Sequence, residues 1–448
     1  MKIKKFKFRN IIYRILVMIV ILIITLSMEK LFEYLLIDDI ENYSRLTIHE
    51  MYSQDDIDIL FLGSSHCFMG IDPSVIDKEL KKKTFNAGTV SQLYDGSYAI
   101  LKEADRIYDL EEVYMDLYYA QGLMENKKDR TIFDRTYLIS DYMRMSPNRI
   151  RFITQASTKE NWINGFSPAR RNWRNIFDSE IISDITENKN IKYKNYEYLT
   201  APVSDYLGKG FVGFKKKQEP EHNWCSHHFE EIPTECVTEE NQKELIKIID
   251  YCRENDISLK FIVVPMSDLM LADIGNYDNY IDYMKNFARQ NGVDYVDFNL
   301  CKRDVFSSED SLFYDESHLN IDGARVFSKT LAEYMLGNLG EEAFFESYEK
   351  KVQGDDFKVL GYFVIDYDQN VGRTFEIVDN GKQAEEYKVE LIRQTKEGTE
   401  IDRSLIQDYS ENKIYEIPKD DFVKLIVDHR EKGDDDIMKI EYCLSPHK

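Results

Sequence analysis

The chain has 448 residues, of which 43% are hydrophobic and 13% aromatic, and its formal net charge is −23. This composition excludes a globally disordered chain and provides enough apolar residues for a sizeable core in two or three domains. A chain this acidic is not expected to bind nucleic acid, because contacts with a phosphate backbone need clustered Lys and Arg.

The N-terminal segment predicts a membrane anchor. Six Lys and Arg residues precede the first acid, Glu29, and residues 11–28 are almost entirely apolar. A run of this length is just sufficient to cross a bilayer as a helix, and no small-residue cleavage site follows it. We therefore interpret residues 1–28 as a cytoplasmic tail and an uncleaved anchor rather than a signal peptide. The positive-inside rule places the main body outside the cell membrane, beginning with a helical stalk at 29–54.

An alternation of strands and helices follows the stalk. Strands are expected at 57–62, 84–86, 112–117, 259–264 and 293–298, and helices at 73–82, 95–108, 239–255, 279–290 and 320–336. Strands separated by helices of this length predict an α/β fold with a three-layer parallel sheet, spanning residues 55–345. Ligand sites in such sheets lie at the carboxyl ends of the strands.

The stretch at 119–238 is too long for a loop and is expected to form a partly helical cap inserted into the α/β domain. Within it, Cys225 and Cys236 are close enough in sequence to form a disulfide in an oxidising space. A nearby group of metal-binding residue types fits no standard ligand spacing, so no metal is expected. This group consists of His222, Cys225, His227 and His228.

From residue 350 onward the pattern changes to short alternating runs separated by polar turns. These runs lie at 357–365, 374–378, 387–392, 413–417, 422–427 and 438–444. They predict a small β-sandwich at 350–448. The segment contains no obvious catalytic constellation, so a binding or packing role is expected for it.

Two segments of the α/β region carry the residue types of nucleophilic catalysis. The first strand breaks at Gly63, and the tight turn there is expected to lift the Ser65 hydroxyl above the end of the strand. Asp315 and His318 lie three residues apart near the end of the same domain. A serine needs a base to take its proton, and a carboxylate can orient that base. Ser65 is therefore the predicted nucleophile, His318 the base and Asp315 the orienting acid, with no cofactor.

The surroundings of Ser65 are expected to stabilise an oxyanion. The predicted donors are the backbone N–H of Ser65 and that of Gly88, which follows the second strand. Candidate lining residues are Ser64, His66, Asn86 and Tyr118. Gly-Ser-Ser alone is usually a turn, and Asp-x-x-His alone is often a helix start. Their joint position at the ends of predicted strands favours a triad.

These motifs resemble the SGNH (GDSL-type) hydrolase superfamily over residues 57–336, outside the insertion. The Gly-Ser-Ser turn resembles its nucleophile block, with Ser64 in place of the usual Asp. Gly88 is similar to the glycine of the second block, and Asp315 with His318 to the closing block. The resemblance implies an SGNH-like, flavodoxin-like fold. The family's Gly-x-Asn block has no counterpart here, which puts the third oxyanion donor in doubt.

Further features resemble a membrane-anchored subgroup of this superfamily. They are the N-terminal anchor, Asp72-Pro73 at a helix start, Asn-x-Gly after the second strand, and Asp-x-x-His-Leu. The subgroup includes proteins of D-alanyl transfer to teichoic acid and of alginate O-acetylation, which act outside the membrane on cell-surface polymers. Those proteins receive acyl groups from a membrane-bound O-acyltransferase, and the resemblance implies similar partners here.

The expected function is therefore that of an extracytoplasmic serine acyltransferase or esterase acting on a cell-surface glycan or polymer. Two alternatives remain. One is a carbohydrate acetyl esterase, because water can replace the acceptor hydroxyl in the same chemistry. The other is a non-catalytic glycan-binding scaffold in a polymer-modification complex.

Overall fold

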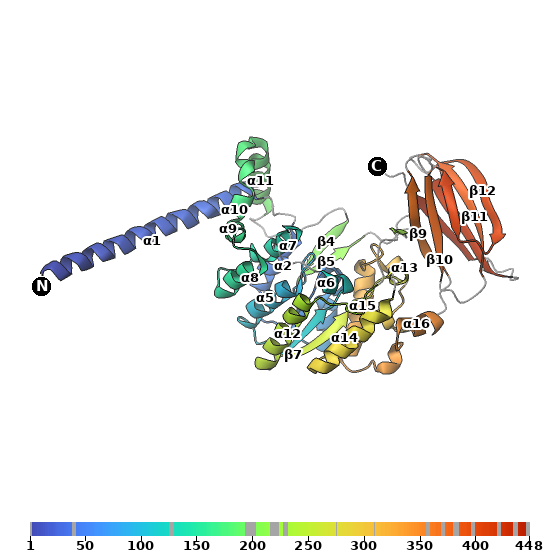
Figure 1. Cartoon of the computed structure of the whole chain (residues 1–448), viewed down its shortest axis with the longest axis horizontal. Coiled ribbons are helices and arrows are strands. Elements are labelled where there is room, and N and C mark those ends of the chain that lie inside the picture. The colour runs from blue at the N-terminus through green and yellow to red at the C-terminus, as the bar shows by residue number, and fades with distance from the viewer. Residues whose placement is uncertain are drawn as a thin grey trace. The chain divides into compact units, whose positions relative to one another are not determined.

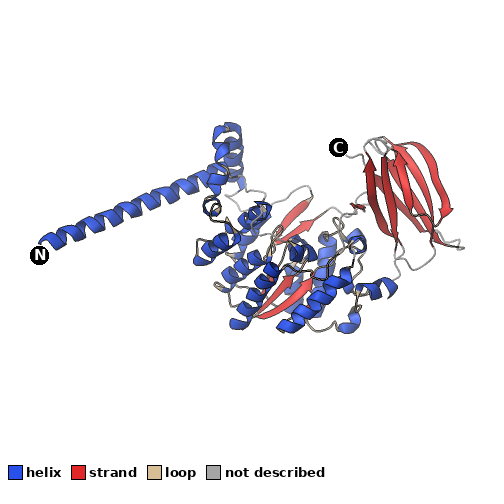
Figure 2. Ribbon diagram, viewed as in Figure 1, coloured by secondary structure: helices blue, strands red, loops and turns tan. Residues whose placement is uncertain are grey.

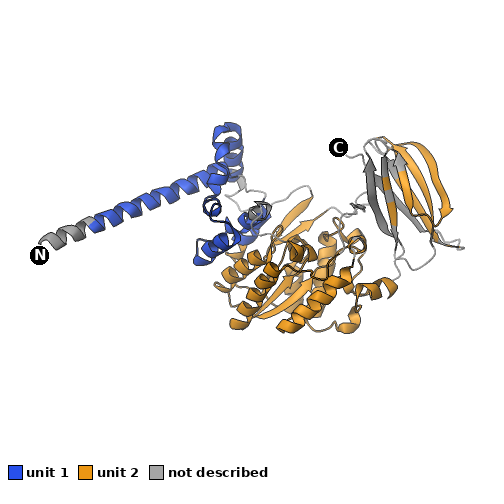
Figure 3. Ribbon diagram, in the orientation of Figure 1, with its two compact units in different colours: residues 1–49, 126–199 blue, residues 50–125, 200–448 orange. Residues whose placement is uncertain are grey.

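The computed structural model describes most of the chain, and its helices and strands are shown in Figures 1 and 2. The described residues are 2–37, 42–124, 130–192, 203–215, 224–226, 232–274, 276–308, 310–354, 359–368, 372–379, 385–395, 399–418, 423–432 and 438–444. The chain divides into two compact units, residues 1–49 with 126–199 and residues 50–125 with 200–448 (Figure 3). The inserted stretch expected at 119–238 is thus shared between the two units.

The first unit is helical where it is described. Its elements are α1 (Lys2–Leu36), α7 (Arg130–Ser140), α8 (Pro147–Ala156), α9 (Trp162–Phe166), α10 (Pro168–Arg171), the 3-10 helix η1 (Trp173–Phe177) and α11 (Ser179–Lys192), while α2 (Tyr43–Met51) crosses the boundary between the units. Over Ile11–Leu36, α1 is long and apolar enough to cross a membrane, with a mean hydropathy of 2.7. The predicted anchor and the first part of the predicted stalk therefore form one continuous helix.

The second unit contains a five-stranded sheet in which every pairing is parallel. Its strands are β1 (Ile59–Leu62), β2 (Thr84–Asn86), β3 (Glu112–Asp116), β7 (Ser258–Val263) and β8 (Asp294–Asp297). The order β2-β1-β3-β7-β8 is that of flavodoxin-like doubly wound sheets, in which the order of strand addition switches sides between β1 and β3. The predicted α/β fold with a parallel sheet is confirmed.

Helices pack against this sheet in two groups. Helix α15 (Ile321–Met335) contacts both α3 (Ser65–Gly70) and α4 (Pro73–Leu80), α5 (Tyr94–Asp105) contacts α12 (Glu239–Glu254), and α14 (Tyr277–Asn291) lies against β8. Ile59 and Phe61 of β1 are fully buried in one core cluster with Phe327 and Leu331 of α15. This packing holds α15 against β1, and removing one such large side chain typically costs roughly 3–5 kcal/mol.

Side-chain caps determine where the helices near β1 begin. Asp72 accepts a hydrogen bond from the Ser74 N–H at the start of α4, where Pro73 occupies the first helical position. Asn320 caps α15 in the same way, since its side chain accepts from Asp322 and Gly323. The cap on α15 terminates the segment that carries His318 and so helps to hold it in place.

The C-terminal region forms two four-stranded sheets, seen as red arrows in Figure 2. Their orders are β13-β10-β9-β6 and β12-β11-β14-β15. The strands are β6 (Trp224–Ser226), β9 (Val359–Asp368), β10 (Gly372–Asp379), β11 (Glu385–Gln394), β12 (Glu400–Ser410), β13 (Ile414–Pro418), β14 (Val423–Glu431) and β15 (Met438–Leu444). The strands after residue 358 pair antiparallel with one another. Among the described strands of these two sheets, only β6 forms a parallel pair. It comes from the inserted stretch and pairs with β9.

The disulfide considered between Cys225 and Cys236 is not formed. Cys236 is a free, buried thiol, and its Sγ donates a hydrogen bond to the Pro233 carbonyl oxygen at 2.8 Å. Cys67, Cys252 and Cys301 are also free and buried. These cysteines act as small apolar core residues, because a buried thiol is a weak donor with little need of a partner.

Candidate active site

The turn after β1 places Ser65 at the first position of α3. Gly63 has φ +156°, and a Cβ there would lie 2.8 Å from the Cβ atoms of both Asp116 and Cys67. Only glycine fits so close an approach, which explains the Gly-Ser-Ser sequence. Ser64 caps the helix in an extended conformation, and Ser65 follows it. The turn therefore lies at the carboxyl end of β1, where doubly wound sheets bind ligands.

The side chains of Ser65, His318 and Asp315 meet above this end of the sheet. Ser65 Oγ lies 2.7 Å from His318 Nε2, and His318 Nδ1 lies 2.9 Å and 3.1 Å from the Asp315 carboxylate oxygens Oδ1 and Oδ2. Ser65 and His318 are both partly exposed, so a substrate can reach them. The order is hydroxyl, imidazole, carboxylate, which is the arrangement that activates a serine nucleophile.

Asp315 is held as an ionised acceptor. Its Oδ1 accepts hydrogen bonds from the backbone N–H groups of Ser317 at 2.9 Å and His318 at 2.8 Å. Burial raises the pKa of Asp315, but the hydrogen bonds and charge of His318 and these backbone donors outweigh it and lower the pKa to about 2. Because an ionised carboxylate can only accept, the network assigns the proton of His318 to Nδ1 and leaves Nε2 to accept from Ser65.

The segment around His318 is fixed by contacts that the sequence did not reveal. Ser317 Oγ lies 2.9 Å from His318 Nδ1 and 3.2 Å from Asp315 Oδ1, so it joins both members of the pair. The Glu316 carbonyl accepts from the N–H and the hydroxyl of Ser267. The only available sequence signal for Ser317 was its position inside the Asp-x-x-His motif, and the sequence provided none for Ser267.

Asn86 connects β2 to α3 rather than lining the open site. Its Nδ2 donates to the carbonyl oxygens of Cys67 at 2.8 Å and Ile71 at 2.9 Å. Its Oδ1 accepts from the Gly88 N–H at 3.0 Å, and the residue is fully buried. The Gly88 N–H is therefore already engaged, so a role for it as an oxyanion donor requires this bond to be exchanged. The N–H of Ser65, in the first turn of α3, is the other predicted donor.

His66 forms one wall beside the base. Its ring stacks on Tyr118 at 3.9 Å between centroids and lies 4.5 Å from the ring of His318. Burial and the neighbouring His318 lower the pKa of His66 well below its usual value, although Asp315 opposes them. A neutral imidazole adds no second positive charge beside His318 and leaves it as the base. Both His66 and Tyr118 were predicted as lining residues.

Two buried polar groups lie under the turn. The Ser64 hydroxyl is buried with no hydrogen-bond partner, so it does not act on the His318 base. Asp116, at the end of β3, accepts from the Val264 N–H through Oδ1 at 3.0 Å, while its Oδ2 has no partner. Burial raises the pKa of Asp116 to about 7. No sequence motif singled out Asp116.

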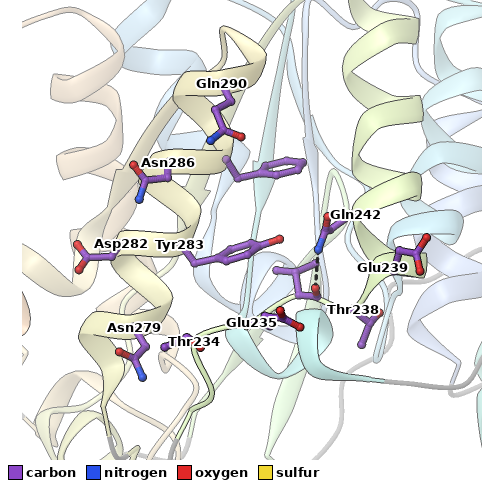
Figure 4. Close-up of a pocket in the computed structure, with 12 residues that line it drawn as sticks. Thr234, Glu235, Thr238, Glu239, Gln242, Asn279, Asp282, Tyr283, Asn286 and Gln290 are labelled. Carbon is purple, nitrogen blue, oxygen red and sulfur yellow. Dashed lines mark hydrogen bonds between the residues drawn. The ribbon is translucent and has the colours of Figure 1, made fainter.

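A hollow of about 930 Å³ lies on the same unit, between α12 and α14 (Figure 4). Of its twelve lining residues none is Lys or Arg, and three are acidic: Glu235, Glu239 and Asp282. The rings of Tyr283 and Phe287 are nearly parallel, with 9° between their planes. In Figure 4 the hydroxyl of Tyr283 points toward Gln242. The hollow thus combines aromatic faces with amide and carboxylate groups.

No group of His, Cys, Asp and Glu able to hold a metal ion occurs among the described residues. Of the group considered in the sequence, His222, His227 and His228 lie outside the described residues, and Cys225 is described only through its backbone.

No protein family and no curated protein matches the chain. Among solved structures, a Streptococcus pneumonia protein named for platelet activating factor is 12% identical, with 69% of this chain and 99% of that chain covered and a TM-score of 0.32. An endo-beta-1,4-mannanase from Thermotoga petrophila is 10% identical, with 91% and 94% covered and a TM-score of 0.17. Likenesses this low assign neither a family nor an activity to the chain.

Proposed function

We propose that the protein is a membrane-anchored serine acyltransferase or esterase of the SGNH type, acting outside the cell membrane on acyl esters of a cell-surface polysaccharide or teichoic-acid-like polymer. The observation that supports it most is the 2.7 Å contact between Ser65 Oγ and His318 Nε2, which continues to Asp315. The apolar stretch of α1 and the basic residues at the start of that helix support a cytoplasmic N-terminus and a single span.

In the first half-reaction, Ser65 Oγ attacks the acyl carbonyl carbon of the donor while His318 Nε2 takes the hydroxyl proton. The bond to the leaving alcohol breaks as His318 returns this proton to the alcohol oxygen, and the acyl group remains as an ester on Ser65. Asp315 stabilises the imidazolium that forms between these steps. The negative charge on the carbonyl oxygen develops beside the N–H of Ser65, and each donor of this kind is typically worth roughly 3–4 kcal/mol.

In the second half-reaction, His318 takes a proton from an acceptor hydroxyl, which attacks the acyl carbon. Ser65 leaves and recovers its proton from His318. A sugar hydroxyl gives transfer and water gives hydrolysis, so the outcome depends on which acceptor is held beside the ester. A membrane-bound O-acyltransferase is the proposed partner that supplies the acyl group.

The hollow between α12 and α14 is the proposed holding site for the sugar chain. Aromatic faces pack against the apolar face of a sugar ring, and amides and carboxylates bind its hydroxyl groups. Three acids and no basic residue line it, so an uncharged or amino-bearing glycan fits better than a polyanion.

A fluorophosphonate that reacts only with activated serines tests the proposal. The full-length protein in detergent micelles is expected to become labelled on Ser65, and Ser65→Ala is expected to lose the label. Ser64→Ala is the matched control, because it removes a neighbouring hydroxyl that is buried and makes no hydrogen bond to the base, and it should label normally. A folded wild-type protein that does not react would favour the scaffold alternative.

The holding site makes a separate prediction. Tyr283→Ala should raise the KM for a neutral glycan acceptor about 2- to 13-fold, since an aromatic contact is worth about 0.5–1.5 kcal/mol. The rate of labelling at Ser65 should not change, because Tyr283 does not contact the triad. Lys285→Ala, an exposed change on the same helix but outside the hollow, is the control. An unchanged KM in Tyr283→Ala would place the acceptor elsewhere.

A further inference from the structure

The first unit exposes a group of large apolar side chains on η1 and α11. Phe177 is 79% exposed, Trp173 52% and Ile176 49%, and Ile181 of α11 is 39% exposed. The Trp173 and Phe177 rings contact each other edge to face at 5.8 Å. We call Trp173, Ile176, Phe177 and Ile181 the apolar patch. A group of exposed aromatic and aliphatic side chains usually marks a surface that meets a protein or a membrane.

The patch is tied to the end of the apolar helix α1. Glu29 accepts hydrogen bonds from Ser167 Oγ at 2.9 Å and from the Ala169 N–H at 3.3 Å, just before η1. Asn175 Nδ2, within η1, donates to the Leu36 carbonyl oxygen at 2.9 Å. The segment that carries the patch therefore lies along residues 29–36 of α1 (Figure 3).

A third tie comes from α11. Lys189 is buried, and its ammonium group donates to the carbonyl oxygens of Glu33 and Tyr34 at 3.2 Å each. Tyr34 also donates to Asn190 Oδ1 at 2.6 Å. These ties hold α11 against α1, so the patch cannot move along the helix without breaking several hydrogen bonds at once.

The position along α1 places the patch at the level of lipid headgroups. Residues 11–28, the apolar stretch, span about 27 Å of an apolar core about 30 Å thick, and residues 29–36 rise about 12 Å beyond it at 1.5 Å per residue. Leu36, which Asn175 contacts, therefore lies about 9 Å beyond the apolar core, at the outer edge of the headgroups. The headgroup layer on each side of a bilayer is about 5–8 Å thick. Trp and other aromatic side chains concentrate in that layer, where an amphipathic ring has both apolar and polar surroundings.

The charges around the patch are mixed. Arg170 and Arg174 are exposed, and the Arg174 guanidinium lies 6.0 Å from the Trp173 ring. Asp178 and Glu180 are exposed beside them. The binding energy must therefore come mainly from the apolar side chains, with the arginines able to reach lipid phosphates.

We propose that the apolar patch inserts into the headgroup layer on the outer face of the membrane that α1 crosses. There it forms a second, shallow contact with the lipid. The proposal rests on α1 crossing the membrane and is independent of the chemistry at Ser65. Its effect is to fix the orientation of the helical unit, since one spanning helix alone can rotate about its axis and a second contact prevents this rotation.

Quenching by brominated lipid tests the proposal. The full-length protein is reconstituted into phosphatidylcholine vesicles whose acyl chains carry bromine near the headgroup, and tryptophan emission is compared with that in unbrominated vesicles. Emission is expected to fall, and Trp173→Phe is expected to lose this quenched component. Trp162→Phe is the matched control, because the Trp162 indole is tied internally to the Thr154 and Ser157 carbonyl oxygens, and it should keep the quenching.

Flotation of the same vesicles distinguishes the two requirements of the proposal, which are that α1 anchors the protein in the membrane and that the apolar patch inserts into the lipid. Protein that floats with the vesicles but shows equal emission with and without bromine would overturn insertion of the patch and leave it as a protein-binding surface. Quenching that persists in Trp173→Phe would also overturn it. Protein that does not float would overturn the anchoring of α1 and with it the proposal, while labelling of Ser65 would be unaffected.

Discussion

Replacing Asp315 by alanine is expected to lower kcat for acyl transfer or ester hydrolysis about 10⁴-fold, the size of loss seen when a triad carboxylate is removed. The carboxylate accepts from His318 Nδ1 at 2.9 Å and is what assigns the Nδ1 proton. Without it, His318 can protonate Nε2 instead and can no longer accept from Ser65. Ser317 Oγ also contacts Nδ1, but a hydroxyl can donate as well as accept and does not impose one tautomer.

Asp315→Asn should lose less than Asp315→Ala. The backbone N–H groups of Ser317 and His318 both donate to Oδ1, so the amide oxygen of the asparagine must occupy that position. It can then still accept from Nδ1 and keep the tautomer, while the charge that stabilises the imidazolium is lost. The activity is therefore expected to be highest in the wild type, lower in Asp315→Asn and lowest in Asp315→Ala. This order follows from the two backbone N–H groups that donate to Oδ1.

The rate constant of fluorophosphonate labelling at Ser65 measures these effects without knowledge of the acceptor. Because the pKa of Asp315 is about 2, the carboxylate stays ionised in any assay above about pH 4, so the comparison can be made at neutral pH. Asp304→Ala, which removes an exposed acid of the same unit, is the control. Equal rates in the wild type and Asp315→Ala would remove Asp315 from the mechanism.

The elements of the parallel sheet could be predicted closely because each strand is a short apolar run between amphipathic helices. Thr84–Asn86 has the expected bounds, and Glu112–Asp116 differs by one residue from the expectation. The same rule failed for Glu400–Ser410, which is a strand although its sequence is polar and its first seven residues are exposed. It is an edge strand held by pairing with β11, and edge pairing leaves no apolar run in the sequence.

The candidate site was predictable where chemistry requires a residue type at a strand end. Ser65, Asp315 and His318 could be chosen because each follows or precedes a predicted element. The outcome for Asn86 could not be predicted, since a residue at the end of β2 can point into the site or toward α3, and only the hydrogen bonds to Cys67 and Ile71 decide between these. Sequence spacing likewise contains no information on which residues become buried together around Asp116.

Replacing Asp116 by asparagine is expected to remove a pH-dependent loss of stability. The folded protein raises the pKa of this carboxyl from 3.8 to about 7, mainly through burial, with a further contribution from the buried Asp297. The folded state therefore holds the proton more tightly than the unfolded chain. The contribution of Asp116 to the free energy of unfolding is favourable at low pH and decreases as pH rises from about 4 to about 7.

Between pH 5 and pH 8.5 this contribution falls by roughly 3 kcal/mol in the wild type. Asn cannot ionise, so Asp116→Asn should be free of this decrease. Its buried amide pays a cost for an unpaired N–H, about 1–3 kcal/mol, but that cost does not change with pH. The variant is thus expected to be relatively more stable at pH 8.5 than at pH 5 when each is compared with the wild type.

Urea unfolding of the full-length protein in detergent micelles gives the free energy of unfolding of the variant and of the wild type at each pH. The prediction concerns how the difference between the two proteins changes from pH 5 to pH 8.5. The exposed Asp294 on β8 gives the matched control: Asp294→Asn removes one carboxylate without removing a buried one, and its stability relative to the wild type should change little with pH. If Asp116→Asn shifted the free energy of unfolding by the same amount at both pH values, the carboxyl would have to be ionised in the folded protein throughout. An ionised carboxylate there would need a hydrogen-bond donor for Oδ2. In the structure this atom lies next to Gly63 and has no hydrogen-bond partner.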